Sequence, residues 1–191
     1  WHVFNLLWSA TVVIITWRGD NPWPRFYTPL AFRLETLFWL AATLHSTACC
    51  VEAKGACGHR TARRCIPGFH FVTLALFEVC LPVAWFVTIV VFFVLDPLNP
   101  AIFISADHFC NTLCLSIELA VNDTLAVRAP RLVLVVLWSC AYMAMLWIRR
   151  AADPRLRRWP YFFLALDDGS ALGWYSMLLC LHVVVFFALV R

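Results

Sequence analysis

The chain alternates between long apolar runs and short polar connections. A membrane-spanning helix needs about 20 mostly apolar residues, within a range of roughly 17 to 25. Six runs meet or approach this length, so the pattern predicts helices at residues 1–17, 29–51, 69–95, 101–121, 131–148 and 170–190. The connections are too short for a separate soluble domain. We therefore expect residues 1–191 to form one all-α domain, a polytopic membrane bundle of six transmembrane helices.

The fourth run, AIFISADHFCNTLCLSIELAV, carries a stripe of polar side chains. Four of them step by four, three and four residues, which places them on one face of a helix. They are Asp107, Asn111, Cys114 and Glu118, with His108 beside them. Ionisable groups at bilayer depth are costly and usually face a bundle interior or a wet cavity. We therefore expect this stripe to face the inside of the bundle.

Polar groups also interrupt the other predicted spans. The second span holds one cation, Arg33, which cannot pair with every carboxylate in the spans. The sixth span holds His182, and Glu78 comes one turn before Pro82 in the third. The predicted intramembrane polar cluster comprises Glu35, His45, Glu78, Asp107, Asn111 and Glu118. A single residue of this kind is usually a structural contact between helices, worth roughly 0.6 kcal/mol. Because several polar residues gather on one face of the fourth span, we expect that face to line a cavity or a site.

Composition supports a membrane protein. The chain is 63% hydrophobic and only 14% charged, whereas a soluble domain is about 45–50% apolar. Its mean hydropathy is +0.79. We predict an integral membrane protein and leave the organelle open between an organellar inner membrane and an endomembrane.

The net charge of +4 comes mainly from arginines that gather in the connections between spans. Basic residues at these places contact lipid headgroups, so membrane lipids are the expected partners and nucleic acid is not. The predicted headgroup contacts are Arg149, Arg150, Arg155, Arg157 and Arg158.

Neither a metal nor a cofactor is predicted. Cys57, His59 and Cys65 supply only three soft ligands in one loop, whereas a structural zinc site normally closes with four. Haem or a pigment, bound by His45, His108 or His182, stays open as an alternative, but only His45 and His182 could lie at matching depth.

Four stretches, in this order along the chain, resemble a family of six-span membrane proteins. They are RFYTPLAFRLETLFWLAATL at 25–44, LPVAWFVTIVVFFVLD at 81–96, DHFCNTLCLSIEL at 107–119 and WPYFFLALDDG at 159–169. The family includes the androgen-induced-gene proteins, which hydrolyse fatty-acid esters of hydroxy fatty acids, and the more distant Rolling stone proteins. In the hydrolase branch, a Thr at the start of the second span is the nucleophile. A His in an Asn-His-x-x-His motif of the fourth span is its base.

The resemblance places Thr28 at the nucleophile position and His108 at the first His of the motif. Asn111 stands at the position of the base, which resembles the Rolling stone branch. An Asn amide cannot accept the proton of a Thr hydroxyl at a useful pKa. Thr28 also has a structural explanation, because Pro29 suits the first helical position with Thr28 as N-cap.

Two functions follow from these residues. The first is a non-enzymatic integral membrane protein, an accessory or scaffold subunit of a larger membrane assembly with other membrane-protein subunits and lipids as partners. The alternative is an intramembrane lipid-ester hydrolase in which Thr28 acts with His108, aided by Asp107 or Glu35. A transporter or proton relay is permitted by the carboxylates but lacks an inverted repeat.

Overall fold

The computed structural model describes residues 1–17, 26–55, 67–95, 106–122, 125–153, 159–166 and 169–190. Within these ranges the chain forms six α-helices and no β-strand, which confirms the all-α prediction. The helices are α1 (His2–Trp17), α2 (Tyr27–Gly55), α3 (Pro67–Val90), α5 (Ala106–Val121), α6 (Leu132–Ala152) and α7 (Ala171–Leu189). A π-helical turn, η1 (Val91–Leu95), continues α3, and the 3-10 turns η2 (Ala129–Arg131) and η3 (Phe162–Leu164) flank α6. Each helix falls on one of the six apolar runs.

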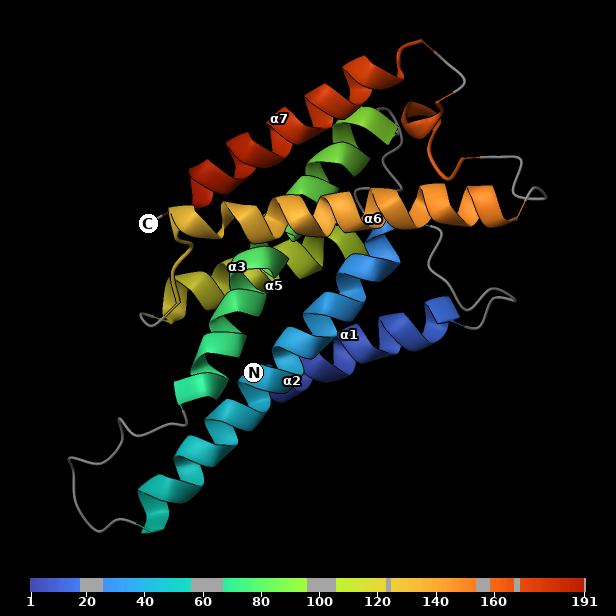
Figure 1. Ribbon diagram of the computed structural model, residues 1–191. Helices are drawn as coiled ribbons and strands as arrows, with labels where there is room; N and C mark the ends of the chain where they lie inside the picture. Colours follow the sequence, from blue (N-terminus) through green and yellow to red (C-terminus); the bar gives the residue numbers. More distant parts are fainter. Residues whose placement is uncertain are drawn as a thin grey trace.

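Helix α3 is the centre of the arrangement, because it packs against α2, α5, α6 and α7. In Figure 1, α1 and α2 lie on one side of α3, α7 lies on the other, and α6 crosses in front of α3. Two wholly buried rings join α2 to α3, since the centroids of Phe38 and Phe77 are 5.4 Å apart. Pro82 lies inside α3 without ending it.

Three helical segments are long and apolar enough to cross a membrane: Gly68–Leu95, Ala129–Ala152 and Ala171–Leu189. Two shorter apolar segments, His2–Ile14 and His108–Val121, lie in α1 and α5. The central segment in α3 is mostly buried, whereas those in α6 and α7 are mostly exposed. Large apolar side chains cover the exposed faces, among them Leu137, Ile148, Leu172, Val184 and Phe187. Many large exposed apolar side chains are normal on lipid-facing helices.

Glu78 anchors the segment between α5 and α6 to the central helix. Its side chain is wholly buried, and Oε1 accepts hydrogen bonds from Nε of Arg128 at 2.9 Å and from the Arg128 backbone N–H at 3.2 Å. Nε of Arg131 lies 3.0 Å from Oε2, and its guanidinium packs over Phe71 at 4.7 Å from the ring centroid. Two cations thus compensate one buried carboxylate.

Candidate functional site: an apolar cavity beside α3

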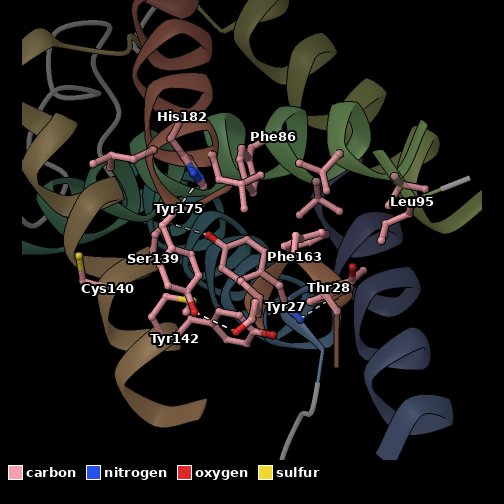
Figure 2. A pocket seen from close by; sticks show the side chains of 18 of the residues that line it. Tyr27, Thr28, Phe86, Leu95, Ser139, Cys140, Tyr142, Phe163, Tyr175 and His182 are labelled. Atoms are coloured by element: carbon pink, nitrogen blue, oxygen red, sulfur yellow. Dashed lines mark hydrogen bonds between the residues drawn. The ribbon is translucent and has the colours of Figure 1, made fainter. Parts of the chain in front are cut away.

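A cavity of about 350 Å³ lies between the start of α2, the second half of α3, α6, α7 and the segment around η3. Figure 2 shows its wall, where Phe86 and Leu95 come from α3 and η1, and Phe163 from η3. The described lining residues are almost all apolar or aromatic, and none of them is Asp, Glu, Lys or Arg. Ligand pockets in proteins have this character, with volumes of about 300–1,000 Å³ and a few placed polar groups.

Three polar side chains from three helices meet on the wall, and we refer to Tyr27, Ser139 and His182 as the polar triad. The Tyr27 hydroxyl lies 3.2 Å from Oγ of Ser139, which in turn lies 3.5 Å from Nε2 of His182. Figure 2 shows the three side chains approaching one another from α2, α6 and α7. Buried polar groups are stable when they satisfy one another in this way.

The His182 ring is held by apolar surroundings. It stacks on Phe86 with ring centroids 3.5 Å apart and planes inclined by 18°, and it is 4% exposed. A hydrogen bond to the backbone of Leu178, one turn earlier in α7, involves the same ring. An imidazole that donates from one nitrogen to a carbonyl presents the other as an acceptor. Because Nε2 faces Ser139, Nε2 is the acceptor that the triad uses.

Tyr161 holds the start of α2 at the cavity. Its phenol oxygen accepts a hydrogen bond from the Tyr27 backbone N–H at 3.1 Å, which satisfies one of the unpaired donors at the helix N-terminus. Its ring stacks on Phe163 with centroids 5.0 Å apart. Burial raises the pKa of the Tyr161 hydroxyl above its ordinary value, so this group stays neutral.

The two residues of the predicted hydrolase pair, Thr28 and His108, have different described neighbours. Thr28 lines the cavity, and α2 begins at Tyr27, two residues before the predicted first helical position Pro29, so Thr28 lies within the helix and not at its N-cap. His108 is not among the described residues that line the cavity. Its carbonyl lies at the contact between α3 and α5, where it accepts hydrogen bonds from Oγ1 of Thr88 at 3.1 Å and of Thr112 at 3.2 Å.

Of the predicted polar stripe, Asn111 and Glu118 face the inside of the fold, whereas Cys114 and the adjacent His108 are half-buried. Asn111 and Glu118 are buried, while Phe109, Leu113 and Ile117 on other faces of α5 are exposed. The side chain of Asp107 lies outside the described part of the structure.

The other polar side chains of the spans meet different neighbours. Glu35 accepts a hydrogen bond from Nε1 of Trp39 at 3.0 Å and has Asn111 as its other hydrogen-bonding neighbour. Glu78 is paired with Arg128 and Arg131, as described above.

Glu118 joins the start of α1 to the last turn of α5. Its carboxylate accepts hydrogen bonds from Nε1 of Trp1 at 2.8 Å and from Nδ2 of Asn122 at 3.1 Å. Nε2 of His2 lies 3.0 Å from the same carboxylate, and its Nδ1 lies 3.0 Å from Oγ of Ser46. The contact thus ties α1 to both α5 and α2.

His45, Arg149 and Arg150 are not among the described residues of the cavity wall. His45 is beside His70, with ring centroids 5.5 Å apart, and not beside His182. Arg149 and Arg150 occupy the last turn of α6, and the Arg150 guanidinium lies 4.4 Å from the centroid of Trp159. Arg155, Arg157 and Arg158, like Cys57, His59 and Cys65, lie outside the described residues. The part of the chain that the structure describes contains no group of three or more His, Cys, Asp or Glu able to hold a metal ion.

Sequence reasoning overlooked most of the cavity wall. Tyr27, Ser139 and Tyr161 were read as part of a span or of its flanks, although all three line the cavity. A signal was present in the fifth apolar run, where WSCAY places a hydroxyl between aromatic residues. Periodicity within one run cannot reveal that such a hydroxyl meets side chains from two other runs.

Comparisons of the chain with family models, curated proteins and solved structures find no match.

The apolar lining of the cavity suits an apolar ligand. Its walls favour hydrocarbon by the hydrophobic effect. The polar triad adds hydrogen-bonding capacity at one place.

Proposed function

We propose that the chain is a six-span, non-enzymatic membrane protein that acts as an accessory or scaffold subunit and holds a lipid hydrocarbon chain in its cavity. The observation that carries the proposal is the cavity of about 350 Å³ with an almost wholly apolar wall. Burial of a methylene group stabilises a complex by about 0.8 kcal/mol, so even part of a lipid chain gains appreciable binding energy there.

The six-span arrangement is supported by the match between helices and apolar runs. Three of the segments have the length and hydropathy of membrane spans. In this arrangement α1, α2 and α5 complete the bundle, and the exposed apolar faces of α6 and α7 contact lipid or neighbouring subunits. Arg149 and Arg150, at the end of α6, lie where lipid headgroups would meet them.

The resemblance to the androgen-induced-gene and Rolling stone proteins supports the same proposal. It implies a six-span fold, and Asn111 at the position of the base favours the branch without a clear enzymatic chemistry. The buried contact of Asn111 with Glu35 gives this amide a structural part in the fold.

Filling the cavity tests lipid binding. Ala144 lines the cavity on α6, so Ala144→Trp is expected to lower photolabelling by a diazirine-bearing lipid chain about tenfold, a loss of about 1.4 kcal/mol. Ala141→Trp is the matched control, because Ala141 is exposed on the same helix and is not part of the described cavity wall. Equal labelling of the two variants and the wild type would contradict binding in the cavity.

The alternative function is a lipid-ester hydrolase that uses Thr28. One observation favours it, because Thr28 lines the cavity in which the acyl chain would lie. A Thr hydroxyl needs a base within hydrogen-bond reach, and His108 is not on the described cavity wall.

An activity-based fluorophosphonate probe separates the two functions. For a non-enzymatic protein, we expect labelling of the wild type at the background level and no change in Thr28→Ala. Thr36→Ala is the control on the same helix, since the Thr36 hydroxyl donates to the Phe32 carbonyl at 2.8 Å. Strong labelling of the wild type and of Thr36→Ala that is lost in Thr28→Ala would establish the hydrolase instead.

A further inference from the structure

We propose that the polar triad makes the cavity selective for a neutral lipid alcohol, a long apolar chain or ring system that carries one hydroxyl group. The inference rests on the proposed binding of a lipid in the cavity and adds the chemical class of that lipid. It concerns recognition by Tyr27, Ser139 and His182, and it requires no covalent step.

The charge of the wall favours a neutral ligand. No Asp, Glu, Lys or Arg is among the described lining residues, and the His182 ring is buried against Phe86. A phosphate or carboxylate placed at the triad would meet no described cation on the wall. Burying an unpaired charge is far more costly than burying a hydrogen-bonded hydroxyl.

The hydrogen bonds of the triad determine which neutral group fits. Because Nε2 of His182 is an acceptor, the Ser139 hydroxyl donates either to it or to Tyr27. In the first case Tyr27 donates to Ser139, and both hydroxyl oxygens keep a lone pair able to accept a further hydrogen bond, with Trp138 as a second hydrogen-bonding neighbour of the Tyr27 hydroxyl. In the second case the Tyr27 hydroxyl needs an acceptor and Nε2 needs a donor. A ligand hydroxyl satisfies either pattern, because it donates and accepts.

The hydrogen bond between Ser139 and His182 is weak, so a ligand hydroxyl can improve on it. The separation of 3.5 Å between Oγ of Ser139 and Nε2 of His182 is long for a hydrogen bond, whose usual range ends near 3.2 Å. A buried acceptor with a weak donor gains more from a new partner than a satisfied one. An ether oxygen only accepts hydrogen bonds, so it cannot donate one to Nε2 of His182.

The test compares three photoactivatable probes of equal chain length in nanodiscs: a long-chain alcohol, its methyl ether and the corresponding carboxylate. We expect the wild type to label about tenfold more with the alcohol than with the ether, the effect of one buried hydrogen bond. The carboxylate is expected to label less than the alcohol.

Two substitutions connect this preference to the triad. Ser139→Ala and His182→Phe, which retains a ring against Phe86, are expected to bring the ratio of alcohol to ether labelling close to one. Labelling by the ether should persist in both variants, which shows that the cavity is intact. Cys140→Ala is the matched control, because Cys140 lines the cavity beside Ser139 without a place in the triad.

The outcomes also separate this inference from the proposed function. Equal labelling of the wild type by alcohol and ether, or stronger labelling by the carboxylate, would overturn the selectivity while leaving lipid binding in place. A preference for the alcohol that survives in both triad variants would overturn the role of the triad. Failure of every probe to label the wild type would overturn lipid binding itself and the selectivity with it.

Discussion

Replacement of both Arg128 and Arg131 by Ala is expected to lower the free energy of unfolding by about 3 kcal/mol, the lower end of the cost of breaking a buried ion pair, because the Arg128 side chain is 48% exposed. The two guanidinium groups lie 2.9 and 3.0 Å from the carboxylate oxygens of Glu78, whose side chain has no exposed surface. Without them the carboxylate keeps the backbone N–H of Arg128 but loses both compensating charges. Equilibrium unfolding in mixed micelles of increasing SDS fraction measures the loss.

Replacing Glu78 together with the two arginines should restore most of the lost free energy of unfolding. A triple variant with Glu78→Met, Arg128→Ala and Arg131→Ala replaces the ionic site by apolar groups, which is often neutral for stability. The control Arg149→Ala with Arg150→Ala makes the same change in net charge at the end of α6, where it removes contacts such as the packing of Arg150 on Trp159, worth about 0.5–1 kcal/mol. A double variant at Arg128 and Arg131 that unfolds like the wild type would contradict this account of Glu78.

The helices could be predicted from the sequence because hydropathy is a local property. A helix makes its backbone hydrogen bonds within one segment, so the position of each helix depends little on the rest of the chain. The polar stripe of α5 was predicted for the same reason, and Asn111 and Glu118 are buried as its period requires. Arg33 was considered as the partner of the carboxylates, whereas Glu78 is paired with Arg128 and Arg131, 50 residues or more away in the sequence.

The cavity could not be predicted in the same way, because its polar groups come from separate helices. His182 was recognised as an unusual residue in an apolar run, but nothing near it in the sequence indicates Ser139 or Tyr27. Their meeting depends on how α2, α6 and α7 pack around the second half of α3, which hydropathy does not determine. Thr28 was predicted as a site residue from the family resemblance alone. The structure adds that Thr28 lines an apolar cavity.

Glu118→Ala is expected to lower the free energy of unfolding by about 2 kcal/mol, because it removes the acceptor of several hydrogen bonds at once. Trp1, His2 and Asn122 all contact this carboxylate, which is nearly inaccessible to solvent. We place the effect below the sum of three buried bonds because the Trp1 and His2 side chains are partly exposed. Ile117→Ala, on an exposed face of the same helix, is the control and should cost less than about 1 kcal/mol.

A double-mutant cycle shows whether this carboxylate acts through α1. The ring centroids of His2 and Trp39 are 5.9 Å apart. His2→Phe retains a ring beside Trp39 but removes the nitrogens that contact Glu118 and Ser46. We expect a coupling free energy of about 1 kcal/mol between His2→Phe and Glu118→Ala, since each alone breaks the same bond. Strict additivity would mean that Glu118 stabilises α5 locally. The measured coupling therefore decides whether α1, which packs mainly on α2, is also held at the end of α5 by this contact.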